Sequence, residues 1–305
     1  MVRRLIEALA ILGEENKDVV ILVVDDGEVY HALNRRIPDR IINIGISECN
    51  AISIGAGLAS CGHLPVVVGG NSFLAYRAYE FIRDQLCMQK RNVKVVGIGA
   101  GMAISVLGNT QHATEDVGAL RGIPGLTVMT PATPTEVAHV VRTAAELDGP
   151  VFIRVGRSCG VDFYRDGFEF RPYKMQKVMD GKDVLVFATG SIVCDAIEAA
   201  RQIGGRHVGV VNVHTIKPID RESLKIYGLE KKKWIVLEEH NMDGGLGGAI
   251  AEVIADENIR VELRRMGLQG KFAAGYGTYQ EIKARNGLSI QDICRVCREV
   301  MGGCV

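Results

Sequence analysis

The stretch Asp39-Arg-Ile-Ile-Asn-Ile-Gly-Ile-Ser-Glu-Cys-Asn-Ala-Ile-Ser-Ile-Gly-Ala-Gly-Leu-Ala59 decides the fold. Residues 41–46 form a β-branched run that is typical of a buried parallel strand, and a single acid, Glu48, follows it. The small residues between 51 and 59 let a helix pack closely against its neighbours. An acid at a strand end among apolar residues lies where α/β proteins do chemistry, and it can hold or share a proton near neutral pH. We therefore interpret Glu48 as a functional acid; the alternative is a helix N-cap or a surface acid.

Strand and helix patterns alternate on both sides of this stretch. This alternation predicts a doubly wound parallel sheet over residues 1–160. The predicted strands lie at residues 19–24, 41–46, 64–68, 93–98, 126–130 and 151–155, and the predicted helices at 3–14, 72–89 and 136–147.

The pattern breaks into aromatic and charged residues near position 160, which predicts an interdomain linker at 161–180, with an edge strand as an option. A second α/β set follows and predicts a second doubly wound domain at 181–305, with a mostly parallel sheet. Its predicted strands lie at 184–188, 207–213, 234–237 and 261–264, and its predicted helices at 192–203, 245–255 and 290–300.

Composition narrows the class of protein. The 36 acidic and 36 basic residues balance, so nothing points to nucleic acid or a membrane surface as a partner. No apolar run is long enough to span a membrane, and the N-terminus lacks the pattern of a signal peptide. The eight cysteines show no framework spacing, which predicts reduced thiols and a cytoplasmic protein. Cys294 and Cys297 form a CxxC, which we interpret as two thiols on one helix face rather than a zinc or redox site.

Several motifs then resemble one family. Ile-Asn-Ile-Gly-Ile-Ser-Glu48-Cys-Asn resembles the Gly-Ile-Ala-Glu-Gln-Asn motif of transketolases, and residues 72–83 resemble the aromatic segment that follows it there. Further matching motifs lie in the same order at 115–116, 120–124, 128–132, 149–154 and 238–248. The resemblance covers nearly the whole chain.

The resemblance covers only part of a full transketolase, because the Gly-Asp-Gly motif that holds magnesium and the cofactor diphosphate is missing. The chain therefore looks like the C-terminal half of a split transketolase: a pyrimidine-binding domain followed by the small C-terminal domain. This implies a separate N-terminal subunit that holds Mg²⁺ and the diphosphate, and no metal site on this chain. It also implies self-dimer contacts within a two-plus-two heterotetramer.

The family's cofactor is thiamine diphosphate, and the resemblance assigns it five residues here. Glu48 matches the acid that activates the aminopyrimidine. Phe73 and Tyr76 match aromatics that pack around that ring, and Tyr79 matches a third, although its helical phase drifts. Plain core packing of an amphipathic helix is the alternative for all three. Asp25 corresponds to an acid near the cofactor, with a helix N-cap as the alternative.

Arg157 matches a family arginine that grips the substrate phosphate, a task that suits a guanidinium at a strand end. Its neighbour Arg154 lies on the opposite face of the strand, and we expect a structural ion pair there. The implied activity is transfer of a two-carbon ketol unit between a ketose donor and an aldehyde acceptor, both of them sugar-type small molecules.

The glycine-rich loop departs from the family pattern. Ordinary transketolases have a histidine where this chain has Gly99, and Asp-Gly-x-Thr-His-Gln where it has Leu107-Gly-Asn-Thr-Gln-His112. Gln111 and His112 are therefore candidate substrate contacts, and His112 a displaced general acid–base group or simply a loop histidine. The substitutions predict a non-standard substrate. Two alternatives stay open: the beta subunit of a 2-oxoacid dehydrogenase or decarboxylase, which carries a similar Gln-His pair, and a non-catalytic partner subunit.

Overall fold

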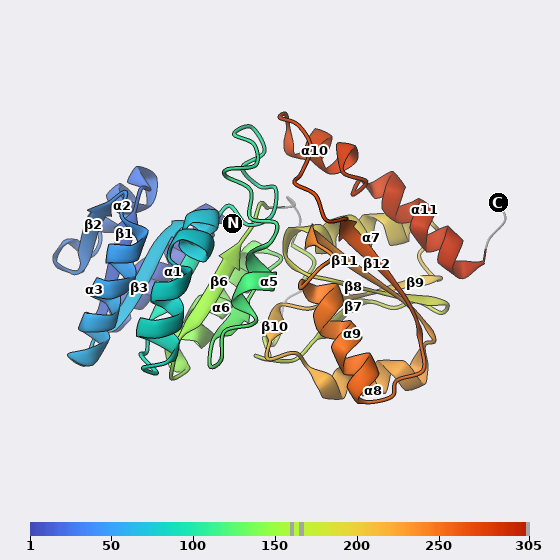
Figure 1. Cartoon of the computed structure of the whole chain (residues 1–305), viewed down its shortest axis with the longest axis horizontal. Helices are drawn as coiled ribbons and strands as arrows, with labels where there is room; N and C mark the ends of the chain where they lie inside the picture. The colour runs from blue at the N-terminus through green and yellow to red at the C-terminus, as the bar shows by residue number, and fades with distance from the viewer. Residues whose placement is uncertain (159–161, 165–167, 303–305) are drawn as a thin grey trace.

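The computed structural model describes residues 1–158, 162–164 and 168–302, and it consists of two α/β domains side by side (Figure 1). Parts of the predicted linker, residues 161 and 165–167, and the boundary at residue 160 lie outside the described residues. Within the part that is described, no helix is long and apolar enough to cross a membrane.

The first domain is built on a seven-stranded sheet with the order β10-β5-β6-β4-β3-β1-β2. All neighbouring pairs in it are parallel except β10 with β5. Its strands are β1 (Val19–Val24), β2 (Ile41–Gly45), β3 (Leu64–Gly70), β4 (Lys94–Ile98), β5 (Thr127–Met129), β6 (Val151–Val155) and β10 (Thr215–Lys217).

Helices cover both faces of this sheet, as the prediction of a doubly wound domain requires. Alternate strand residues supply the two cores: Ile21 and Val23 face one side, Leu22 and Val24 the other. The first side carries α1 (Val2–Glu15), α2 (Gly27–Asn34) and α6 (Pro134–Glu146). The second carries α3 (Glu48–Ser60), η2 (Phe73–Arg77), α4 (Tyr79–Phe81) and η3 (Ile82–Cys87), and α5 (Asp116–Leu120) follows the glycine-rich loop.

Two predictions for this domain need correction. Residues 72–89 form two π-helical turns around a short α-helical piece, not one regular α-helix. Strand β2 is parallel but not buried, because it lies at the sheet edge and pairs only with β1. Its residue Ile42 and the nearby Ile46 are exposed.

The second domain has a five-stranded sheet with the order β12-β11-β8-β9-β7, parallel except for β7. Its strands are β7 (Gln176–Met179), β8 (Val184–Ala188), β9 (Val208–Asn212), β11 (Lys233–Asn241) and β12 (Glu262–Leu268). One face carries η4 (Gly190–Ile192), α7 (Val193–Gln202), α10 (Tyr279–Arg285) and α11 (Ile290–Met301), and the other α8 (Arg221–Glu230) and α9 (Leu246–Asp256).

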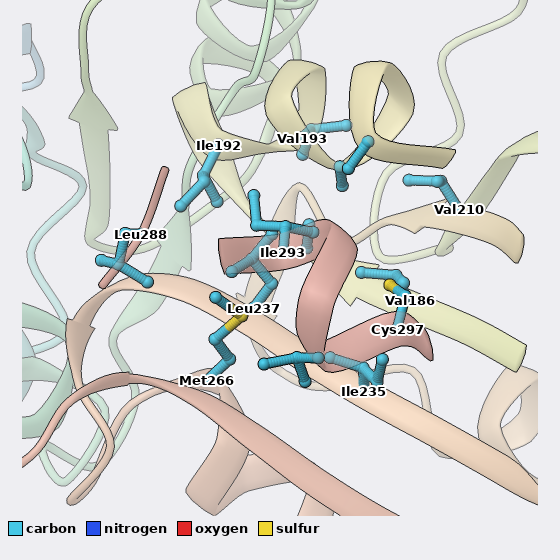
Figure 2. Packing of buried hydrophobic residues seen from close by; sticks show 14 of the residues in the cluster. Val186, Ile192, Val193, Val210, Ile235, Leu237, Met266, Leu288, Ile293 and Cys297 are labelled. Carbon is cyan, nitrogen blue, oxygen red and sulfur yellow. The ribbon is translucent and has the colours of Figure 1, made fainter. Parts of the chain in front are cut away.

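Figure 2 shows the core between α7, α11 and this sheet. Val186 and Val210 from the sheet meet Val193 from α7 and Ile293 from α11. Cys297 packs into the same cluster, and Cys294 is buried beside it. The interpretation of the CxxC as two thiols on one buried helix face is confirmed.

The chain crosses between the two sheets more than the predicted boundaries provide for. Strand β7 lies inside the predicted linker yet belongs to the second sheet, at its edge. Strand β10 follows β9 in the chain yet pairs with β5 of the first sheet. The boundaries 1–160, 161–180 and 181–305 therefore stay a proposal about folding units.

The expectation that all cysteines are reduced is wrong, because Cys194 is disulfide-bonded. Spacing in the sequence carries no signal for a single bridge of this kind. Five other cysteines of the described residues are free: Cys49, Cys61, Cys87, Cys294 and Cys297.

Candidate functional site

The predicted site residues gather at one edge of the first sheet. Since the strands are parallel, the segments that leave β1, β2, β3, β4 and β6 all emerge at the same carboxyl edge. Glu48 follows β2 and Arg157 follows β6, so four strand spacings separate them, roughly 19 Å at about 4.8 Å each. From β2 inward, the edge carries Glu48, then Asp25, Phe73, the loop 99–113 and Arg157.

Glu48 is the first residue of α3, and only 1% of its surface is exposed. Ser47 holds the N-cap position of that helix, so neither alternative interpretation of Glu48, a cap or a surface acid, is correct. Its Oε2 accepts a hydrogen bond of 2.7 Å from Nη1 of Arg77. A buried carboxylate is thus held at the sheet edge by a guanidinium whose side chain is 51% exposed.

The same guanidinium lies over the ring of Phe73, with its central carbon 4.8 Å from the ring centroid. The π-helical turn of η2 begins at Phe73 and ends at Arg77, and such turns are frequent at functional sites. Glu48 and Phe73 therefore hold one flat group that carries N–H donors. An aminopyrimidine is also flat and carries N–H donors, so this pair of residues fits the predicted ring.

The other two aromatics of the segment lie differently. The hydroxyl of Tyr76 donates to Oε2 of Glu115 and accepts from the backbone N–H of Glu115, both at 3.0 Å. Burial raises the pKa of Tyr76 well above its usual value, so the phenol is neutral. Tyr79 packs against the hydrophobic cluster under α3 and η3. The structure thus brings Phe73 to Glu48, Tyr76 to Glu115 and Tyr79 to the core.

Asp25 ends β1 in the left-handed region, at φ 50°, and its side chain is exposed. The N-cap of α2 is its neighbour Asp26, whose side chain accepts a hydrogen bond of 3.0 Å from the backbone N–H of Val29. The alternative of Asp25 as a helix N-cap is therefore wrong. Its backbone N–H bonds to the carbonyl of Gly45, which ties the ends of β1 and β2 together.

His112 is buried within its loop, with 2% of its surface exposed. Neither ring nitrogen has a hydrogen-bond partner among the residues that the structure describes. Burial lowers the pKa of His112, against a raising effect of the charge on Glu115, so the ring is neutral near pH 7. A bridge between Gly101 and Ala113 closes the loop, and Gln111 on it is half-buried.

Arg157 extends from the end of β6 and is exposed. Its Nη1 lies 3.5 Å from the carbonyl oxygen of Ala103, and its guanidinium lies 5.5 Å from the ring centroid of Tyr279 in the second domain. A cavity of about 420 Å³ opens beside it, against α7 and α10. Arg154 instead pairs with Asp116 at 2.6 Å in the interior, which confirms its prediction as a structural ion pair.

Sequence reasoning missed Arg77 and Glu115, the partners of Glu48 and Tyr76. A signal existed for Arg77: it follows Phe73 by four residues, the spacing that places two side chains on one helical face. Among the described residues, no group of three His, Cys, Asp or Glu side chains could hold a metal ion.

The fold and this edge define a two-domain, doubly wound α/β protein whose candidate site lies outside the carboxyl ends of the first sheet. Comparisons with known proteins give the family. Residues 3–160 match the model of the transketolase pyrimidine-binding domain, and residues 173–293 match the transketolase C-terminal domain. The chain belongs to the transketolase family.

Individual relatives agree with this. The chain is 31% identical over 297 residues to one subunit of the apulose-4-phosphate transketolase of Actinobacillus succinogenes, covering 96% of this chain and 94% of the relative. It is 33% identical over 302 residues to a putative transketolase C-terminal section of Methanocaldococcus jannaschii, covering 97% and 94%. A solved split-gene transketolase, described as an inactive beta4 tetramer, superposes with a TM-score of 0.89 at 32% identity and covers 98% of this chain and 97% of that one.

Proposed function

We propose that this chain is the C-terminal subunit of a two-subunit, thiamine-diphosphate-dependent transketolase, a transferase that works with a separate N-terminal subunit. The observation that carries the proposal is the buried carboxylate of Glu48 beside the ring of Phe73, at the carboxyl edge of a sheet. The family supports the chemistry, and the absence of a Gly-Asp-Gly string from the sequence supports the need for a partner.

Thiamine diphosphate, when bound, would supply the stabilised acyl-anion equivalent that transfer of a two-carbon ketol unit requires. In this proposal Glu48 donates or shares a proton with a ring nitrogen of the aminopyrimidine, which a carboxyl group in an apolar pocket can do. Phe73 orients the flat ring by contact with its face. Tyr76, Tyr79 and Asp25 are further proposed contacts with the cofactor.

The substrate contacts are proposed for Arg157, Gln111 and His112. Arg157 has no carboxylate partner among the described residues, so its guanidinium is available for a phosphate or other oxyanion. The relative from Actinobacillus succinogenes is named for apulose 4-phosphate, a substrate with such a group. We therefore propose a ketose and an aldehyde of which at least one carries an anionic end. Leu107, in place of the family's Asp, favours a substrate other than the ordinary pentose phosphates.

The assembly is proposed from the uncovered edge. Beside Glu48, the edge strand β2 and the residue after it expose Ile42 and Ile46, which a partner would bury. We propose that the N-terminal subunit covers this edge and holds Mg²⁺ and the diphosphate. The chain would pair with itself in a cytoplasmic two-plus-two heterotetramer that serves carbohydrate metabolism. The solved relative, a beta4 tetramer, supports self-association.

Calorimetric titration of thiamine diphosphate and Mg²⁺ tests the proposal, with this chain alone, with its N-terminal partner alone and with the mixture. Binding should require the mixture and be lost with Glu48→Ala. Mixtures that bind should then transfer ketol units from a sugar donor to an aldehyde. Decarboxylation of a 2-oxoacid without ketol transfer would favour a 2-oxoacid dehydrogenase beta subunit, an option that the adjacent Gln111 and His112 keep specific. Tight binding to the isolated chain, or no binding by the mixture, would contradict the proposal.

A further inference from the structure

Arg77 occupies both groups that the proposed function gives to the cofactor ring. Its Nη1 donates to Oε2 of Glu48 at 2.7 Å, and its guanidinium lies 4.8 Å from the centroid of Phe73. A guanidinium is planar, carries N–H donors and stacks on aromatic faces, so it presents to this pair the features of an aminopyrimidine.

We propose that Arg77 is a placeholder: it fills the pyrimidine site of the unpartnered chain and leaves Glu48 and Phe73 when the cofactor ring binds. This inference rests on the proposed function and adds a regulation of the same site to it. Glu48 and that face of Phe73 cannot serve the ring and the guanidinium at once, because both groups need the same space against the carboxylate oxygen.

A placeholder has a physical reason in this fold. Glu48 is almost fully buried, and a buried carboxylate without a partner is strongly destabilising. Arg77 supplies the missing partner until a ligand does. In the described part of the chain Glu48 is the one acid within ion-pair distance of Arg77, so no other carboxylate competes for the guanidinium.

The geometry also gives Arg77 a way out. Its side chain is 51% exposed, so it can rotate into solvent while the backbone stays in place. That backbone is anchored: the thiol of Cys49 on α3 lies 3.5 Å from the carbonyl oxygen of Arg77. The N–H of Ala78 bonds back to Phe73 across the π-helical turn. Exchange of side chain for ligand therefore requires no change in the fold.

The first test measures the ion pair without any cofactor. Thermal unfolding of the isolated chain is compared for wild type, Arg77→Met, Glu48→Gln and the double variant. Arg77→Met should lower the melting temperature, and Glu48→Gln in the same chain should restore part of the loss. Arg83→Met is the matched control, because Arg83 lies on the same segment and pairs with Asp84 at the surface. Equal melting temperatures for Arg77→Met and Arg83→Met would overturn the role of Arg77 as partner of Glu48.

The second test titrates thiamine diphosphate with saturating Mg²⁺ into each variant mixed with the N-terminal subunit. Removal of a placeholder that fills the site most of the time should lower the half-saturating concentration by about three- to tenfold. Arg77→Lys keeps a charge for Glu48 without the flat stacking group, so it guards against loss of folding and should give an intermediate value. A half-saturating concentration that is unchanged or raised in Arg77→Met would overturn the placeholder and show that Arg77 holds the cofactor. The proposed function itself fails only if neither wild type nor variant binds.

Discussion

Arg154 and Asp116 form an ion pair in the interior, with Nε of Arg154 2.6 Å from Oδ2 of Asp116 and the two side chains 5% and 0% exposed. Arg154 is on β6, and Asp116 begins α5 after the glycine-rich loop. The guanidinium also donates to the carbonyl oxygens of Ala113, at 2.9 Å, and of Glu239 in the second domain, at 3.3 Å. One buried charge pair thus ties the end of the candidate substrate loop to both domains.

Asp116→Ala should destabilise the chain by about 3–5 kcal/mol, because it leaves the Arg154 guanidinium buried without a partner. Urea unfolding monitored by circular dichroism measures the loss. Arg4→Ala is the control: Arg4 pairs with Glu7 at the surface, where such a pair contributes about 0–1 kcal/mol. Equal losses for the two variants would show that the buried pair does not support the loop.

Glu136→Gln should change how stability depends on pH. Burial raises the pKa of Glu136 to about 7, against hydrogen bonds from Tyr164, Ala132 and Asn212 that lower it. The folded chain therefore holds a proton that the unfolded chain releases near pH 4.3. The stability from this proton is fully present below that pH and is lost as pH rises to 7, with a slope of at most about 1.4 kcal/mol per pH unit.

The variant lacks this slope, so its stability relative to wild type should rise between pH 4.5 and 7 and then level off. Chemical denaturation at several pH values measures the difference. Glu146→Gln, at an exposed position of the same helix, should follow wild type throughout. A pH-independent difference between Glu136→Gln and wild type would contradict the pKa of Glu136.

The thiols should differ in reactivity. Burial raises the pKa of Cys87 to about 11 and that of Cys297 to about 12, whereas Cys61 is exposed. Since the thiolate is the reactive form, iodoacetamide at pH 8 should modify Cys61 first in the native chain. Peptide mass spectrometry measures each site, and labelling in guanidinium chloride supplies the full-reaction reference. Rapid native labelling of Cys297 would contradict the packing in Figure 2.

Glu48→Gln should lower the rate of ketol transfer by the mixed subunits about 10²–10⁴-fold, because an amide cannot share the proton that the proposed role needs. Glu80→Gln, at an exposed position of the same domain, should leave the rate unchanged. Steady-state assays of both variants with the N-terminal subunit, at matched circular dichroism spectra, measure the effect. A Glu48→Gln enzyme with the wild-type rate would remove Glu48 from the mechanism.

The sequence predicts the fold well where strands are buried. Strands β1, β6 and β8 are continuous apolar runs, and the pattern places each within a residue of its bounds. Strand β10 carries no such signal: its three residues pair with β5 across the domain boundary, a contact that depends on the tertiary fold. The exposure of β2 is missed for the same reason, since only the assembled sheet shows that β2 is an edge strand.

The site is predictable in part by the same logic. Parallel strands bring their carboxyl ends together, so Glu48 and Phe73 can be expected at one edge from the sequence. A charged residue such as Arg77 within a helical pattern is usually a solvent-exposed position, and only the buried carboxylate opposite gives it another role. The burial of His112 could not be predicted, because a glycine-rich loop has no periodicity that distinguishes inside from outside.

His112→Leu should separate stability from function. Both ring nitrogens of His112 are buried without partners among the described residues, and such a group costs about 1–3 kcal/mol. An apolar side chain of similar size removes that cost, so urea unfolding of the isolated chain should show a gain of about 1 kcal/mol or more. The same variant should lose ketol transfer in the mixture with its partner if the imidazole moves a proton there. His214→Leu is the control, because His214 is equally buried but has a partner 3.0 Å away in the hydroxyl of Thr215, so its loss should destabilise the chain. A His112→Leu chain that is less stable than wild type would show that the ring is a packing element of the loop, and full activity would show that it moves no proton.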